Sequence, residues 1–149
     1  MARKQGKKIQ TQWAGQFGAA HELTRHGYTV AFTMGNTPDT DLLCKSPKGY
    51  AFSTQVKSLS SKTCFLYQES LLMPNPNLYF IFVLVPENID QSPEYFVLNN
   101  EQFLRTVKEE KQKEEERKRG KPYAEFPPGI MYHTLNRDEF RNAWHNLIN

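Results

Sequence analysis

An unbroken apolar run near the middle of the chain most constrains its fold. Residues 78–85 read Leu-Tyr-Phe-Ile-Phe-Val-Leu-Val, with no alternation between apolar and polar side chains. A strand of this kind is buried on both faces. Both faces of its sheet must therefore be covered by other elements, which are helices in the α/β class. The run predicts a central strand of an α/β protein.

Further elements are predicted before and after this run. A helix over residues 10–26 carries an apolar stripe, which we expect to face the sheet and which consists of Trp13, Phe17, Ala20 and Leu23. Four further strands are predicted at residues 28–33, 40–45, 50–58 and 94–98. The turn Ser46–Gly49 joins the second and third of these as an antiparallel pair.

The C-terminal half predicts two helices. The first begins at Asn99 or Asn100 and ends near Arg119, and its highly charged second half is typical of a solvated surface. The second covers residues 137–148, with Phe140, Trp144 and Leu147 on one face. A length of 149 residues with 38% hydrophobic residues suits one domain. The expected fold is a mixed sheet of about five strands flanked by helices.

Cysteine content and hydropathy indicate where such a protein works. Cys44 and Cys64 are the only cysteines, and neither has a metal-binding spacing, which favours packed thiols in a reducing cell interior. No apolar run approaches the ~20 residues of a membrane span, and the N-terminus lacks the apolar stretch of a secretory signal. We expect a soluble, cytoplasmic protein without a membrane partner.

Residues 1–9 are predicted to form a basic arm. Four cations and no acid lie in this segment, Arg3, Lys4, Lys7 and Lys8, although the whole chain has a net charge of only +3. A basic arm can lie along the phosphates of a nucleic acid. A frayed, solvated terminus is the alternative.

Three polar side chains converge on the predicted hairpin. Gln55 and Lys57 are two residues apart on one strand and point to the same face. Asp41 opens the partner strand, and opposed side chains of an antiparallel pair lie ~5 Å apart. A carboxylate, an amide oxygen and an ammonium in one place can hold a divalent cation and steer a nucleophilic water. Asp39 points the same way if the strand already extends to it.

These residues resemble the motifs of the PD-(D/E)XK nuclease superfamily. The hairpin supplies Pro38-Asp39-Thr40-Asp41 and, in place of the acidic third motif, Gln55-Val56-Lys57. The segment from Gly15 to Tyr28 is similar to the family's first helix, a Gly-Glu pair followed by small and apolar residues and Leu-x-x-x-Gly-Tyr. The family glutamate falls on Gln16. The nearest acid, Glu22, lies roughly 120° away around the helix.

The resemblance implies a nuclease-like fold and a Mg²⁺- or Mn²⁺-dependent endonuclease acting on DNA. It assigns Asp41 to the metal, Gln55 to completing the metal shell, Lys57 to the attacking water and Gln16 to a ligand water. Family members use mainly two carboxylates and a backbone carbonyl, whereas this chain offers one matched carboxylate. The side chains expected at nucleic acid are Lys57, Ser58, Lys62, Arg3, Lys4, Lys7 and Lys8.

Two other functions stay open, as does a homodimer. Glutamine at two acid positions fits a nuclease-fold module that binds nucleic acid or a partner protein and cuts nothing. A structural or assembly subunit would instead use an apolar surface near Phe65, Tyr67 and residues 71–73. Cleavage of DNA with Mg²⁺ or Mn²⁺ distinguishes the nuclease from both.

Overall fold

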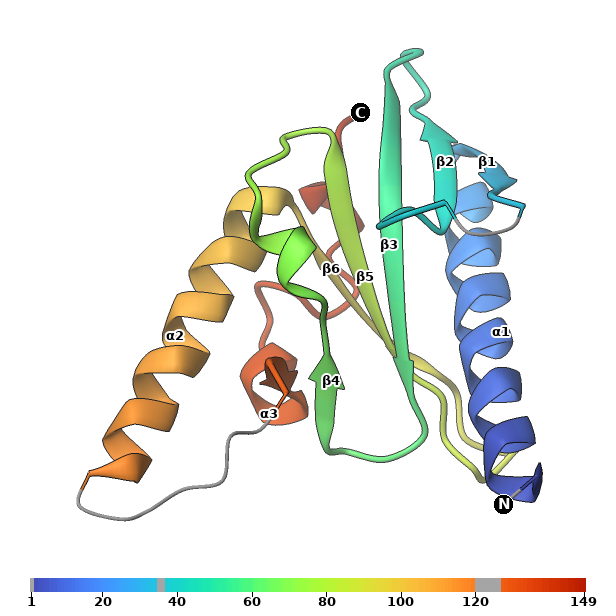
Figure 1. Cartoon of the computed structure of the whole chain (residues 1–149). Helices are drawn as coiled ribbons and strands as arrows, with labels where there is room; N and C mark the ends of the chain where they lie inside the picture. The colour runs from blue at the N-terminus through green and yellow to red at the C-terminus, as the bar shows by residue number, and fades with distance from the viewer. Residues whose placement is uncertain (1, 35–36, 120–126) are drawn as a thin grey trace.

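The computed structural model describes residues 2–34, 37–119 and 127–149, with side chains from residue 5 onward. Its centre is a five-stranded sheet in the order β1-β2-β3-β5-β6 (Figure 1). The strands are β1 (Thr29–Phe32), β2 (Leu42–Lys45), β3 (Ala51–Leu59), β5 (Leu78–Leu84) and β6 (Glu94–Leu98). β3 and β5 run parallel and the other neighbours antiparallel. The predicted α/β class with a five-stranded mixed sheet is confirmed.

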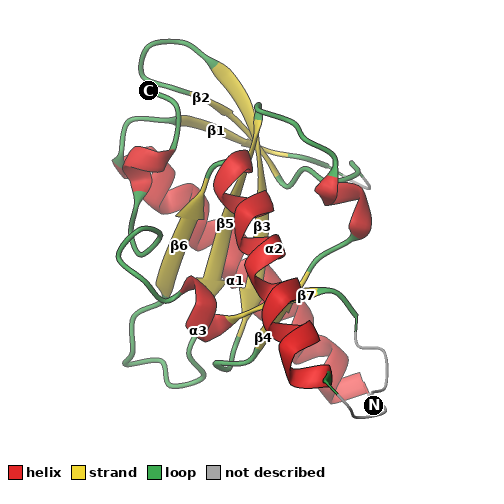
Figure 2. Cartoon of the chain, turned by 90° about the vertical axis from the view of Figure 1, so that its left-hand side faces the viewer, coloured by secondary structure: helices red, strands yellow, loops and turns green. Residues whose placement is uncertain are grey.

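Long helices cover the two faces of the sheet. α1 (Ala2–Arg25) packs on one face and α2 (Asn100–Lys118) on the other, with the sheet behind α2 in Figure 2. Successive residues of β5 alternate between the two cores, Ile81 on the α1 side and Phe80 and Phe82 on the α2 side. All of β5 is therefore buried, as its composition predicts. Within the described residues, no helix is long and apolar enough to cross a membrane.

A second, two-stranded sheet was not predicted. It pairs β4 (Cys64–Leu66) with β7 (Gly129–Met131), and the 3-10 helix η1 (Glu69–Leu72) follows β4. Three-residue strands are too short to show a periodic pattern. Phe65, Tyr67 and Leu71 are buried in the α2-side core, so the apolar surface expected there for an assembly subunit is wrong. Of the residues named for that surface, Met73 is highly exposed.

The predicted closing helix over residues 137–148 is also wrong. The only helical element in these residues is a 3-10 turn, η2 (Trp144–Asn146), and the short α3 (Tyr132–Leu135) ends before them. Phe140 packs in the α2-side core, whereas Trp144 and Leu147 pack in the α1-side core. The segment runs beside β6, and the Val97 N–H of that strand donates to the Phe140 carbonyl at 2.9 Å. One straight helix cannot serve two cores on opposite faces, so the chain folds irregularly.

α1 differs from its prediction in length and orientation. It begins at Ala2, so the residues expected as an arm continue the helix. Trp13 and Phe17 are exposed, although the apolar stripe placed them toward the sheet. The buried side is made of smaller residues and Leu23: Gly15, Gln16, Ala19, Ala20 and Leu23. Small residues allow the helix backbone to approach the sheet closely, which leaves no room for large rings.

The closest approach of α1 to β3 is at Gly15. A Cβ on this residue would lie 1.8 Å from Ser58 Oγ, whereas a Cβ on Gly6 would meet nothing within 4 Å. We expect Gly15→Ala to lower the free energy of unfolding by about 1–3 kcal/mol through overpacking. Gly6→Ala, the matched control, should raise it by about 0.5–1 kcal/mol because alanine favours the helix.

Chemical denaturation measures both changes. Adding Ser58→Gly to Gly15→Ala should restore most of the lost stability, because it removes the atoms that the new Cβ meets. Equal effects of the two glycine substitutions would contradict a close contact at Gly15.

Candidate active site

Asp41 directly precedes the first residue of β2 and lies beside β3. Its N–H donates to the carbonyl of Thr54 at 3.0 Å, the residue of β3 that is also the register partner of Leu42. Its Oδ2 accepts the Val56 N–H at 2.8 Å. The Asp41 carboxylate thus accepts a backbone N–H of β3 that a carbonyl of a neighbouring strand would otherwise accept. The Val56 carbonyl faces the same edge, because the N–H and C=O of one strand residue point to the same side.

Asp41, Gln55 and Lys57 line one pocket of about 490 Å³. Gln55 and Lys57 project from the same face of β3, as their spacing predicts, and Ser58 also reaches the pocket. Further polar side chains come from α1 and from the segment after β4: Lys8, Gln12, Tyr67 and Gln68. The structure therefore brings together the carboxylate, the amide and the ammonium that the hairpin pattern predicted to meet.

Gln16 reaches Asp41 from α1. Its Nε2 donates to Asp41 Oδ1 at 3.4 Å, and the side chain is buried behind the pocket instead of lining it. Lys8 and Gln12 precede Gln16 by eight and four residues and lie on the same side of the helix. Gln12 was not among the residues predicted for the site. Its four-residue spacing from Gln16 was the signal that could have found it.

Burial shifts the pKa of both charged groups of the pocket. It raises the pKa of the Asp41 carboxyl, against the Val56 N–H and the Lys57 charge, which lower it. It lowers the pKa of the Lys57 ammonium, against the negative charges of Asp41 and Asp39. For both groups desolvation outweighs the attraction between them. A perturbed carboxylate and lysine in one pocket are typical of a functional site.

Gln55 carries an unsatisfied acceptor. Its side chain is only 9% exposed, and Oε1 accepts no hydrogen bond from any residue that the structure describes. A buried acceptor without a hydrogen bond lowers the free energy of unfolding by about 1–3 kcal/mol. A hard cation would satisfy it, since Mg²⁺ and Ca²⁺ prefer carboxylate, amide and backbone oxygens. Asp41 Oδ1, Gln55 Oε1 and the Val56 carbonyl are oxygens of these three kinds from residues that line one pocket.

The negative charge available to a cation is small. In the described ranges, no three His, Cys, Asp or Glu side chains gather into a metal-binding group. Asp39 does not supply the second carboxylate on the strand, because it occupies a turn with φ 58° and its Oδ1 accepts the Ser70 hydroxyl at 2.9 Å. Of the residues that the structure describes, one carboxylate and neutral oxygens would therefore hold a cation in this pocket.

The cationic side chains predicted to contact nucleic acid do not all line the site pocket. Lys8 and Lys57 line the 490 Å³ pocket. Lys7 lines a neighbouring pocket of about 510 Å³ with Lys8 and pairs with Glu87 at 3.2 Å. Lys62 does not reach either pocket, because its ammonium lies over the Tyr132 ring, 5.3 Å from the centroid. The side chains of Arg3 and Lys4 lie outside the described residues.

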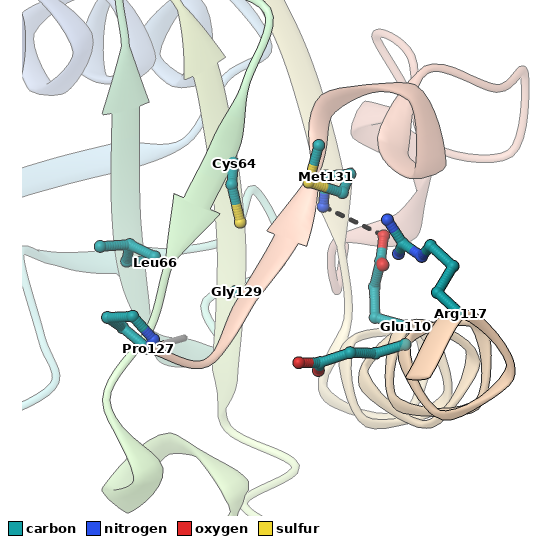
Figure 3. A pocket seen from close by; sticks show the side chains of 8 residues that line it. Cys64, Leu66, Glu110, Arg117, Pro127, Gly129 and Met131 are labelled. Carbon is teal, nitrogen blue, oxygen red and sulfur yellow. Dashed lines mark hydrogen bonds between the residues drawn. The ribbon is translucent and has the colours of Figure 1, made fainter. Parts of the chain in front are cut away.

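A smaller, mainly apolar pocket of about 260 Å³ lies between the β4–β7 sheet and α2 (Figure 3). It shares Cys64, Leu66 and Pro127 with the site pocket. Glu110 is already engaged, because its Oε1 accepts the Met131 N–H at 3.0 Å (Figure 3). Burial, with the charge of Glu110, raises the pKa of the Cys64 thiol, which disfavours a thiolate nucleophile. This pocket offers packing but no reactive group.

The site pocket can hold a cation at its Asp41 end and a phosphate near Lys57. Lys8 is a further group that can contact a phosphate, whereas the Ser58 Oγ is buried against α1 at Gly15. Comparison of the chain with protein-family models, curated proteins and solved structures found no match.

Proposed function

We propose that the chain is a metal-dependent nuclease of the PD-(D/E)XK type that hydrolyses phosphodiester bonds in DNA. The observation that carries this proposal is the orphaned, buried Gln55 Oε1 in one pocket with Asp41 and Lys57. The contact between Gln16 and Asp41 supports the proposal. Gln16 belongs to the helix that resembles the family's first helix, and Asp41 belongs to the hairpin that resembles its other motifs. The mixed sheet is compatible with a nuclease-like fold. Two free cysteines suit the reducing cytoplasm.

Each residue has a defined part in the proposed reaction. Asp41 and Gln55 bind Mg²⁺ or Mn²⁺, which when bound polarises a phosphate and lowers the pKa of a water. Lys57 orients the attacking water and offsets the negative charge that develops on the phosphate. Gln16 is a positioning residue, because it touches Asp41 and holds Oδ1. Lys8 binds a neighbouring phosphate of the substrate.

A binding module without catalysis is the second candidate. It is favoured by one observation, the single carboxylate that the described residues bring to the pocket, since the positions of two family acids hold Gln16 and Gln55. Such a module would bind nucleic acid through Lys8 and Lys57 and leave the phosphodiester bonds intact.

Cleavage of plasmid and labelled DNA tests the proposal. Wild type should cut with Mg²⁺ or Mn²⁺ and not with EDTA. Asp41→Asn should lower the rate at least about 100-fold, because metal assistance contributes several kcal/mol. Asp39→Asn is the matched control and should retain most of the cleavage. Equal rates for wild type and Asp41→Asn would refute the site, and DNA binding without cleavage would favour the module.

Asp41→Asn should not unfold the protein. The amide oxygen can still accept the Val56 N–H, and the substitution removes a charge that burial disfavours. The pKa of Asp41 is raised above 3.8 in the folded protein. Between 3.8 and that raised value, the folded protein therefore binds more protons than the unfolded chain, and lowering the pH through this interval favours folding. Metal-free wild type should gain stability over this interval, and Asp41→Asn should lose that part of the pH dependence in thermal melts.

A further inference from the structure

Three aromatic side chains form an exposed cluster beside α1. Trp13, Phe17 and Phe32 are 48%, 57% and 37% exposed. The Trp13 and Phe17 rings are stacked with centroids 5.4 Å apart, and Phe32 on β1 meets Phe17 edge-on at 5.3 Å. We call these three residues the aromatic platform. Contiguous exposed apolar groups of this kind mark binding surfaces.

The aromatic platform adjoins the Asp41 site through both of its elements. On α1, Phe17 follows Gln16, whose amide donates to the Asp41 carboxylate. On β1, Phe32 precedes Thr33, whose N–H donates to the Asp41 carbonyl at 3.1 Å. A ligand with one group in the site pocket can therefore extend its next groups onto the platform.

The positive charge of α1 indicates which kind of ligand the aromatic platform binds. From residue 2 to residue 21, α1 carries four cations and no acid, and Lys8 of this helix lines the site pocket together with Lys57. A second copy docked through the platform would bring two cationic helices together, which opposes association. Nucleic acid instead offers a negative charge and a flat apolar base in every nucleotide, which complements a cationic groove beside aromatic rings.

We infer that the aromatic platform stacks unpaired bases of a single-stranded or locally opened nucleic acid whose backbone enters the Asp41 pocket. The inference rests on the proposed function for the identity of that pocket. In an intact duplex the base faces are covered by their neighbours, so the platform favours unpaired strands. Stacking on Trp and Phe is tolerant of sequence, because every base has a π-face.

Binding of fluorescent oligonucleotides in EDTA tests this inference without cleavage. The probes are a single strand of about ten nucleotides, within the usual range of such sites, the same length of duplex, and an abasic strand with the same phosphates. Wild type should bind the single strand most tightly. Trp13→Ala and Phe17→Ala should each weaken that binding at least about five-fold and leave the abasic probe unaffected. Trp13→Phe should retain most of the affinity.

Tyr50→Ala is the matched control, because Tyr50 is 55% exposed but lies in the β2–β3 turn; it should bind all three probes as wild type does. Equal affinity of wild type for the base-bearing and abasic strands would overturn the inference. So would a wild-type dimer, seen by light scattering, that Trp13→Ala dissociates. Base-dependent binding without any cleavage would support base stacking on the aromatic platform and refute the nuclease function. Cleavage without base-dependent binding would support the nuclease function and refute base stacking.

Discussion

Lys57→Met is expected to lower divalent-dependent cleavage by about 100- to 10,000-fold, the range for losing a group that assists proton transfer at the reaction centre. The ammonium lies in the pocket with Asp41 and Gln55, where it can orient a water and face a phosphate. Methionine keeps an unbranched apolar side chain and removes the ammonium, with its charge and its N–H donors. Rates measured at saturating metal separate this loss from any weakening of metal binding.

The same substitution should not lower stability. Burial lowers the folded pKa of Lys57 below 10.5 even with Asp41 and Asp39 nearby, so the charged form carries a net cost in the folded protein below that lowered pKa. Removing the charge should leave the melting temperature at pH 7 unchanged or higher. Lys62→Met is the matched control, because Lys62 lies over Tyr132 outside the pocket, and it should cleave as wild type does. Cleavage within a few-fold of wild type by Lys57→Met would remove Lys57 from the mechanism.

Gln16→Glu combined with Gln55→Glu is expected to raise divalent affinity at least about ten-fold, because a screened charge pair near 4 Å contributes ~1 to 4 kcal/mol. The two changes give the positions the carboxylates that the resemblance implies, beside Asp41 and Lys57. Cleavage should appear or strengthen, since a metal nuclease works by fixing cation, water and phosphate in one geometry. Calorimetric titration with Mn²⁺ and single-turnover cleavage measure the two effects.

The double variant should fold less well without metal. Three neighbouring carboxylates, two in the pocket and one behind it, raise one another's pKa, so metal-free stability should fall as the pH rises through those raised values. Gln12→Glu is the matched control: Gln12 lines the pocket but is exposed, so its substitution should change affinity far less. If the double variant gains neither affinity nor cleavage over an inactive wild type, the binding module becomes the better account.

The strands of the five-stranded sheet could be predicted from the sequence because their signals are local. The apolar run of β5 and the turn before β3 each specify one element, and the register of β2 with β3 then brings Asp41 beside Gln55 and Lys57. The contact of Gln16 with Asp41 also follows from placing one helix beside that hairpin.

The orientation of α1 could not be predicted from apolar periodicity alone. Trp13 and Phe17 share the spacing of a core stripe, yet Gly15 and Ala19 decide which side approaches β3. Backbone proximity is a tertiary property, and it overrides the hydrophobic ranking of side chains. Likewise, Phe140 and Trp144 lie at helical spacing but fill cores on opposite faces of the sheet, which only the path of the chain around β6 reveals.

Anomalous diffraction from crystals grown with Mn²⁺ tests the central claim most directly, that Asp41 and Gln55 share one cation beside Lys57. The account predicts a single strong peak in the pocket, about 2 to 2.5 Å from both Asp41 Oδ1 and Gln55 Oε1, the range of oxygen ligands around hard divalent cations. The peak should vanish in Asp41→Asn crystals. A peak bound elsewhere, or an empty pocket in a wild-type crystal that cleaves DNA when dissolved with Mn²⁺, would contradict the account.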